Sequence, residues 1–308
     1  MIRSLTVKNP RLPDSESSLI MELENPYKSG FFVAGITGLG PPKADINTTR
    51  RAGSDGSVYN SAKVESRNIV ITLIYMGSDI EALRHKTYKY FPIKKEVELS
   101  ISTDRRNGVI KGYVESNEVG LFTNMEGSQI SIVCNNPWFI GDDGNSGIQT
   151  LSNIDALFQF PFGFLQDSNV IRNGKIEFSS RRKGVIKTVQ YNGDVDTGVT
   201  MTITCLAAPG NITIANATSG ESMTISNSAV QKITGTQLSA GDEITITTYT
   251  GRKTATLRRG GTSRNIIAAV GRNSKWITIY SGENNLSVTG SSGQLKVSMD
   301  VDALYEGI

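Results

Sequence analysis

Apolar and polar residues alternate along much of the chain, in short runs separated by turn-forming residues. In the first 140 residues these runs are IRSLTV, SLIMELE, FFVAGI, RNIVITLIYM, VELSIS, GVIKGYVES and QISIVC. A period of two predicts β-strands. In RNIVITLIYM both phases are apolar, so we predict a strand that is covered on both faces. Its two phases are Ile69, Ile71, Leu73 and Tyr75 against Val70, Ile74 and Met76.

One segment has a helical pattern instead. SDIEALRHKTYKYFP opens with Ser78, carries Glu81 three residues later as in a capping box, and ends at Pro92. Its apolar residues share one face of the predicted helix. His85, the sole histidine, lies off that face, so we assign it no chemical role.

The chain beyond residue 165 alternates more cleanly. TMTITC, EITITTYTGRKTATLRR with a turn at TGRK, WITIY and LKVSMDV all read as strands. Seven or more such runs with frequent turns are typical of a β-sandwich or jelly roll. A polar stretch at 135–147 separates the two halves, so we predict a first domain over 1–140, a linker over 141–157 and a second domain over 158–308.

Composition excludes several classes of protein. The net charge of +3 over 308 residues is too small for a nucleic-acid-binding face. Cys134 and Cys205 fit the apolar phase of strand runs far apart in the sequence, which predicts buried free thiols. The N-terminus lacks the apolar core of a signal peptide, and no apolar run reaches membrane-spanning length, so we expect a soluble protein made in the cytoplasm.

A glycine cluster, GITGLGPP at residues 35–42, suggests a phosphate-binding loop at first sight. Such loops open directly into a helix, and here Pro41 and Pro42 prevent that. We therefore interpret the cluster as a turn whose glycines have positive φ or pack closely against backbone, followed by a long polar loop.

Reactive groups are sparse, so we predict a protein that is not an enzyme and needs no metal or cofactor. One histidine and two distant cysteines exclude a Ser-His triad and a His/Cys zinc site. The acidic pair Asp142-Asp143 and the DVD runs at 194–196 and 300–302 are typical of solvated turns. DGNSG at 143–147 is a weak calcium candidate. The aromatic run FQFPFGF at 158–164 favours domain packing, and Trp276 is the one candidate platform for a sugar, although its strand pattern favours the core.

The order of several segments resembles the distal tail proteins of long-tailed phages. These segments are G-x-x-G-L-G-P-P, GSDGSVYNSAKVESRNIVITL, the capped helix, KGYVES and QISIVCNNPWF, then YNGDVDTGVTMTI, LSAGDEITITTYTGRKTATL and WITIYSGENNLSV. The resemblance implies an all-β protein with one short helix. It also implies an N-terminal ring-forming domain, of β-sandwich or split-barrel type, and a C-terminal galectin-like β-sandwich.

The same resemblance implies a structural role in a virion. Six copies would form a ring at the tail tip that joins the tail tube to the tail-associated hub protein and often to receptor-binding proteins. It implies no specific nucleic-acid binding and no membrane insertion. Two alternatives stay open: a carbohydrate-binding β-sandwich that recognises a cell surface, and a glycan-cleaving enzyme that uses paired carboxylates.

Two polar segments are candidate interfaces between copies. The first runs from Pro41 to Gly56 and includes Arg50, Arg51 and Asp55. The second is the hairpin tip from Asp104 to Gly108, with Arg105 and Arg106. Both hold more charge than a strand connection requires. Asp-Gly and Asn-Gly dipeptides within them predict hairpin turns.

Overall fold

The computed structural model describes residues 1–53, 55–120, 125–141, 147–152, 154–156, 179–181, 185–290 and 295–308. The chain divides into two compact units. Unit 1 comprises Met1–Asn145, Gly193–Val195 and Ala303–Ile308, and unit 2 comprises Ser146–Asn192 and Asp196–Asp302. The aromatic run at 158–164, the pair Asp142-Asp143 and most of the candidate calcium loop lie outside the described residues.

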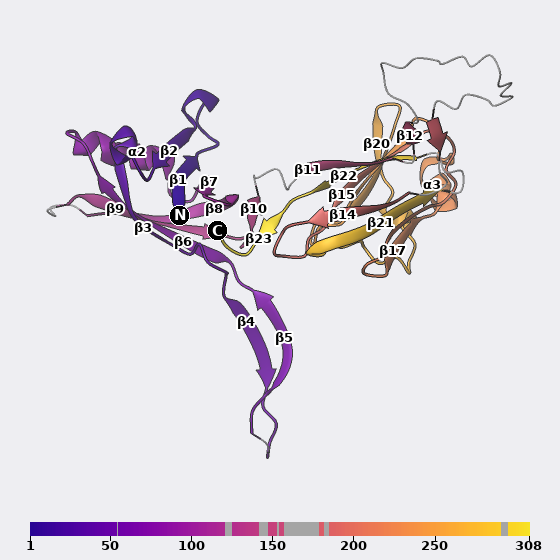
Figure 1. Cartoon of the computed structure of the whole chain (residues 1–308), viewed down its shortest axis with the longest axis horizontal. Helices are drawn as coiled ribbons and strands as arrows, with labels where there is room; N and C mark the ends of the chain where they lie inside the picture. Colours follow the sequence, from indigo (N-terminus) through magenta and orange to yellow (C-terminus); the bar gives the residue numbers. More distant parts are fainter. Residues whose placement is uncertain are drawn as a thin grey trace, which may run out of the picture. The chain divides into compact units, whose positions relative to one another are not determined.

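Unit 1 is built on one antiparallel sheet with the strand order β2-β1-β7-β8-β9-β6-β3, and β10 pairs with both β8 and β23 (Figure 1). The strands are β1 (Ile2–Lys8), β2 (Ser18–Glu22), β3 (Phe31–Thr37), β6 (Arg67–Tyr75), β7 (Glu96–Thr103), β8 (Asn107–Gly120), β9 (Gly127–Cys134), β10 (Phe139–Gly141) and β23 (Leu304–Tyr305). A short 3-10 turn, η1 (Asp14–Glu16), and two helices, α1 (Pro26–Ser29) and α2 (Ile80–Tyr90), complete the unit together with a separate hairpin of β4 (Ala44–Thr49) and β5 (Val58–Val64).

Strand β6 shows why one face of this sheet forms the core. Ile69, Ile71 and Leu73 are at most 1% exposed, whereas Val70 and Ile74 on the other face are only half-buried. The prediction that β6 is covered on both faces is therefore wrong for the chain alone. Nothing in the described part of the chain packs fully over the second phase of this strand, so we call this second side of the sheet the open face.

Helix α2 forms where the sequence predicts it, but its cap differs. Asp79, not Ser78, occupies the N-cap position, and its side chain accepts a hydrogen bond of 2.9 Å from the backbone N of Ala82. The buried side chains of Thr87 and Tyr90 fix the last turn before Pro92. The predicted strands and this helix thus account for most of unit 1.

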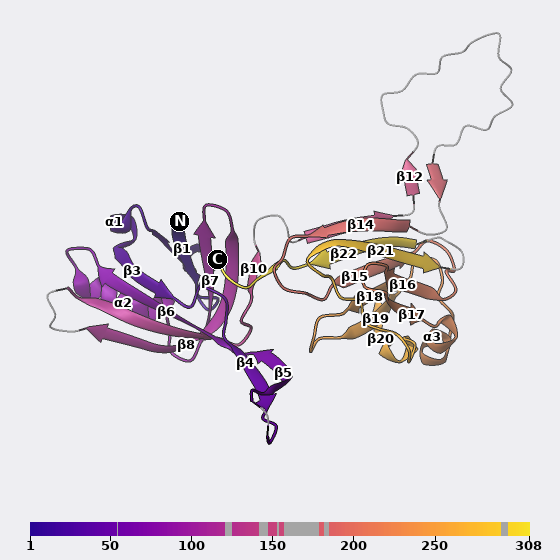
Figure 2. The same cartoon turned by 60° about the horizontal axis from the view of Figure 1, so that its bottom comes forward.

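Unit 2 contains two antiparallel sheets (Figure 2). The first has the order β11-β22-β15-β18-β19-β20 and the second the order β14-β21-β16-β17, with a small β12-β13 pair. The strands are β11 (Gly147–Ser152), β12 (Ile154–Ala156), β13 (Ser179–Arg181), β14 (Val185–Tyr191), β15 (Thr200–Cys205), β16 (Ile212–Asn216), β17 (Glu221–Ile225), β18 (Glu243–Thr247), β19 (Thr254–Arg259), β20 (Thr262–Asn265), β21 (Gly282–Gly290) and β22 (Leu295–Val301). Alternate residues of both sheets, such as Met201, Ile244 and Ile214, are buried, which confirms the all-β class.

Two sequence interpretations in unit 2 need correction. WITIY is not a regular strand, because only Ile279 forms a bridge, with Thr197. Side chains bond the backbone of Ile277 and Thr278 instead. A third α-helix, α3 (Asn227–Thr234), was not predicted. Its signals are present in the sequence, since Ser226 caps the helix and Gly235 ends it with φ 86°. A short 3-10 turn, η2 (Ile267–Ala269), lies after β20.

The last six residues, which the predicted second domain of 158–308 includes, lie in unit 1. Tyr305 pairs with Phe139 in register and is 1% exposed. A Cβ added at Gly108 would lie only 2.3 Å from the Cδ1 of Ile308. This glycine therefore leaves room for residues 303–308, which we call the closing segment. The prediction that the Asn107-Gly108 dipeptide forms a hairpin turn is wrong, because the dipeptide begins β8 and the turn lies just before it.

Both cysteines are buried free thiols, as predicted. Burial raises the pKa of Cys134 to about 11, against an opposing effect of Arg67, and the pKa of Cys205 to about 12. Because the thiolate is the reactive form, both side chains are inert packing groups in the folded protein.

Gly38 provides a test of the glycine prediction. Its φ is +84°, and an added Cβ would lie 2.1 Å from the carbonyl oxygen of Asn68, whereas Gly40 has open space around it. We expect Gly38→Ala to lower the free energy of unfolding of unit 1 by about 2 kcal/mol or more, and Gly40→Ala to change it little.

Urea titrations can separate the two variants. Trp138 and Trp276 are the two tryptophans of the chain, one in each unit, so a Trp276→Phe background leaves Trp138 to report on unit 1. Equal midpoints for the two alanine variants would show that the left-handed conformation at Gly38 has no energetic consequence.

Candidate assembly interface

The first candidate interface is a β-hairpin rather than a polar loop. Strands β4 and β5 pair from Ala44–Val64 at the base to Thr49–Val58 near the tip, and Figure 1 shows this hairpin running away from the sheet of unit 1. We call it the arm. Residues 50–53 and 55–57 lie in its turn, which includes the predicted Asp55-Gly56 dipeptide. The sequence interpretation expected a long polar loop here and predicted neither strand, since polar residues dominate ADINTT.

The arm has one apolar and one polar face. Cross-strand partners share a face, so Ile46 lies on the same face as Ala62. Asp45 and Lys63 lie on the other face, where the Nζ of Lys63 is 3.8 Å from the Oδ2 of Asp45. A β-bulge lies between the pairs Asn47–Ser61 and Thr48–Tyr59 and leaves Asn60 as the extra residue. This one-residue shift puts Tyr59 in phase with Ile46, whereas unbroken alternation would turn it to the polar face.

All thirteen residues of the two arm strands are exposed. Ile46 is 60% exposed and Tyr59 63% exposed. A two-stranded ribbon is at best marginally stable in water by itself. An exposed apolar face on such a ribbon is therefore typical of a segment that packs against another surface.

Arg67 fixes the base of the arm. It lies just after β5, and its Nη1 donates to the carbonyl oxygens of Gly38 and Gly40, which precede β4, at 2.8 Å each. Its Nε donates to Pro137 at 2.8 Å and its Nη2 to Glu306 at 2.5 Å. Both ends of the arm thus meet at one guanidinium.

The Arg67 side chain is itself largely buried, at 4% exposure of the residue, and lies 4.5 Å from the ring centroid of Phe139. Burial lowers the pKa of Arg67, with a smaller opposing effect from Cys134. Among the described residues no carboxylate forms an ion pair with it. The charge is stabilised by carbonyl oxygens and an aromatic face instead.

The predicted interface residues fall in two places. Arg50, Arg51 and Asp55 are exposed and lie together in the turn of the arm. Arg105 is exposed in the β7–β8 turn, whereas Arg106 bonds Asp194 through both Nη atoms, at 2.7 and 2.9 Å. Arg106 also covers the ring of Tyr305, 4.4 Å from its centroid, so this arginine helps to hold the closing segment within unit 1.

Other predicted candidates are also placed. Asp194 of the first DVD run is the ion-pair partner of Arg106. Trp276 is half-buried, with the Nζ of Lys253 5.7 Å from its ring centroid. Within the described ranges no group of three or more His, Cys, Asp or Glu side chains is arranged to hold a metal ion. No helix among these residues is long and apolar enough to cross a membrane.

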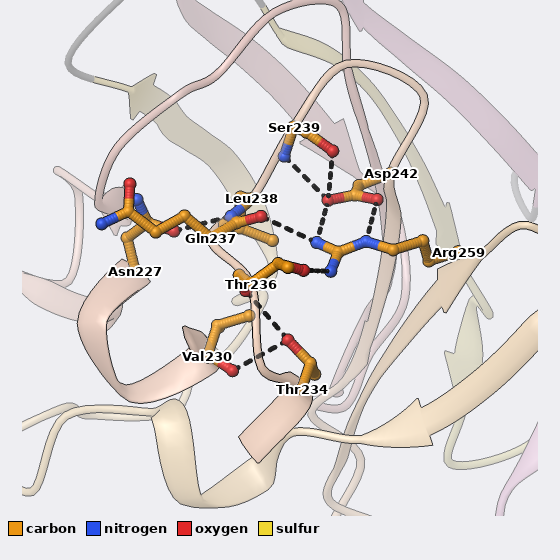
Figure 3. Close-up of polar contacts among 9 residues, drawn as sticks. All are labelled: Asn227, Val230, Thr234, Thr236, Gln237, Leu238, Ser239, Asp242 and Arg259. Atoms are coloured by element: carbon orange, nitrogen blue, oxygen red, sulfur yellow. Dashed lines mark hydrogen bonds and ion pairs between the residues drawn. The ribbon is translucent and has the colours of Figure 1, made fainter. Parts of the chain in front are cut away.

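Unit 2 contains a strongly organised polar cluster around Asp242 and Arg259 (Figure 3). Asp242, 2% exposed at its side chain, accepts from the Nε and Nη2 of Arg259 at 2.7 and 2.5 Å. Arg259 also donates to the Gln237 carbonyl at 2.9 Å and to the hydroxyl of Thr236. Desolvation raises the pKa of Asp242, but bonds from Arg259 and Ser239 outweigh it and lower the pKa overall.

The geometry of both units matches a solved phage protein. The crystal structure of SPP1 Dit, described as a paradigm of the hub adsorption apparatus in phages that infect Gram-positive bacteria, superposes with a TM-score of 0.60 at 12% identity, over 97% of this chain and 98% of that chain. The chain has the Dit fold.

A chain in the structure of the phage P2 baseplate, in its activated conformation with Ca, is also similar, with a TM-score of 0.46 at 12% identity and the same coverage. No protein-family model and no curated protein matches the sequence. The Dit fold spans both units, which confirms the resemblance deduced from the order of the sequence segments at the level of fold.

The Asp242–Arg259 pair predicts how unit 2 responds to acid. Because the folded-state pKa of Asp242 is lowered, its contribution to stability is fully present above about pH 4, the ordinary pKa of Asp, and is lost as pH falls through the folded-state value. We expect Asp242→Asn to be less stable than wild type at pH 7 and to lose less stability between pH 5 and pH 3.

Unfolding in urea, followed by Trp276 fluorescence in a Trp138→Phe background, measures this difference. Asp300→Asn, on an exposed position of β22, is the matched control and should keep the wild-type acid response. If Asp242→Asn lost as much stability between pH 5 and pH 3 as the wild type, other carboxylates would be responsible for the loss of stability in acid.

Proposed function

We propose that this protein is a structural hub of a phage or prophage-derived tail tip, in which copies of the chain close into a hexameric ring. The arm is the observation that carries the proposal. It presents an apolar face that its own unit leaves uncovered, while the Arg67 cluster holds its base in a defined direction. The Dit fold supports the same role.

The open face of the unit 1 sheet is the surface that a neighbouring arm would meet. Register places Phe32 opposite Ile74, and Tyr113 opposite Val133, on this side of the sheet. Phe32 is 41% and Tyr113 45% exposed. An arm and an open face are different surfaces of one chain, so their contact is heterologous and closes into a ring when the rotation permits.

Further partners follow from this proposal. The ring joins the tail tube on one side to the tail-associated hub protein on the other, and unit 2 offers a docking domain for receptor-binding proteins. It is a virion component made in the bacterial host, with no catalytic role. Its small net charge suits a channel that passes DNA without holding it.

Removing the apolar face of the arm tests the assembly. We expect Ile46→Ser/Tyr59→Ser to abolish the hexamer of the wild-type chain in native mass spectrometry, because the two most exposed large apolar side chains of the apolar face are lost. Val58→Ser is the matched control. Val58 is a 39% exposed apolar residue of the same hairpin, but its partner Thr49 places it on the polar face. Loss of assembly in this control would contradict the proposed geometry.

Cysteine crosslinking detects the same contact when assembly is weak. Cys134 and Cys205 are buried, so engineered cysteines react selectively. Oxidation of Ile46→Cys/Ile74→Cys should produce a ladder of covalent oligomers that ends at six copies. Val58→Cys/Ile74→Cys should produce none. A ring formed through the arm would be refuted if the wild-type chain stays monomeric and Ile46→Cys/Ile74→Cys also produces no covalent oligomers.

A further inference from the structure

The edge strand β20 of unit 2 carries polar residues on its core-facing side. Register pairs Arg264 with Leu257 and Thr262 with Arg259, so these four side chains share one face of the sheet. Leu257 is 2% exposed, which identifies this face as the side of the core. On β18, the next strand beyond β19, the same face is apolar, as Ile244 and Ile246 show. The apolar core thus gives way to polar groups at this edge.

These residues line a pocket of about 240 Å³. One wall is β19 and β20, with Leu257, Arg259, Thr262 and Arg264, and the other is the end of α3 and the residues after it, with Thr234 and Thr236. The volume is below the roughly 300 Å³ at which sites for drug-sized molecules begin, so the pocket suits a ligand of about one sugar ring.

The two arginines of the pocket have different roles. Asp242 neutralises and orients Arg259, as Figure 3 shows. Arg264 is exposed and has no ion-pair or hydrogen-bond partner among the described residues. The pocket therefore contains one fixed, compensated guanidinium and one uncompensated positive charge.

The hydroxyl groups of the pocket are set to bond a polyhydroxy ligand. The hydroxyl hydrogen of Thr234 is directed at the carbonyl oxygens of Val230 and Thr236. Its Oγ1 can therefore accept a hydrogen bond from a ligand. The Oγ1 of Thr236 accepts from Arg259 and is left to donate. Paired acceptors and donors beside a free guanidinium match a sugar that carries an acidic group.

We propose that this pocket binds an anionic saccharide, with the acidic group on Arg264 and the ring hydroxyls on Thr234 and Thr236. The acidic group is a carboxylate or a phosphate. None of the described residues that line the pocket is aromatic and could stack on the sugar ring, so we expect a low affinity for a single sugar, on the order of millimolar. This site is separate from the arm and does not depend on ring formation.

Saturation-transfer difference NMR on the full chain tests the site with three probes. Glucuronate carries a carboxylate, glucose 1-phosphate carries a phosphate, and glucose is neutral. We expect the affinity of at least one of the two acidic sugars to be about five times that of glucose, or higher. The stronger of the two identifies the acidic group, and inorganic phosphate should compete less well than either sugar acid that binds.

Two variants assign the binding to the pocket. Arg264→Gln should weaken the acidic sugar about tenfold and remove its advantage over glucose. Arg258→Gln makes the same charge change on the opposite face of the sheet and should leave binding unchanged. Thermal unfolding of both variants checks that the fold is intact.

Four results would overturn the proposal: no binding of any probe, equal binding of glucose, inorganic phosphate competing as well as the sugar acids, or an unchanged affinity in Arg264→Gln. If no probe binds, the inward charge of Arg264 would serve only to protect the exposed sheet edge from pairing with another chain.

Discussion

The buried guanidinium of Arg67 is the interaction on which the arrangement of unit 1 depends. Four of its N–H groups reach carbonyl oxygens, two before the arm, one after β9 and one in the closing segment. A carboxylate partner would neutralise the charge but would fix only one side chain. Carbonyl partners instead fix the backbone of three loops, and each charge-assisted bond contributes about 1.5–3 kcal/mol. The arm, the sheet and the closing segment therefore depend on one another.

This arrangement also explains the glycine cluster GITGLGPP. A phosphate loop directs backbone N–H groups at an anion, whereas here the carbonyl oxygens of Gly38 and Gly40 are directed at a cation of the same chain. Gly38 is required because its left-handed backbone brings it against the carbonyl of Asn68. Sequence inspection could identify that these glycines have a geometric purpose. It could not identify Arg67 as the group they surround, because the contact joins distant positions of the fold.

The elements predicted best are those whose signals are local. Strand alternation, the helix at Ile80–Tyr90 and the hairpin turns at Asp55-Gly56 and TGRK depend on near neighbours in sequence, so they could be predicted. The closing segment could not, since β23 is only two residues long and its place depends on Phe139 and Gly108 far along the chain. The apolar face of the arm was missed for another reason. The bulge at Asn60 reverses the alternation of β5. An unbroken period of two along β5 would place Tyr59 on the opposite face from Ile46.

In both the arm and the unit 2 pocket, residues break the regular alternation of apolar and polar positions along a strand, with different consequences. In the arm, a bulge brings apolar residues together on an exposed face that requires a large complementary surface. In β20, polar residues replace apolar ones on a core-facing side, which creates a small cavity instead of a flat surface. Flat apolar faces favour association between proteins, and small polar cavities favour small solutes. The proposed assembly through unit 1 and the proposed recognition of a sugar acid through unit 2 therefore depend on separate sets of side chains.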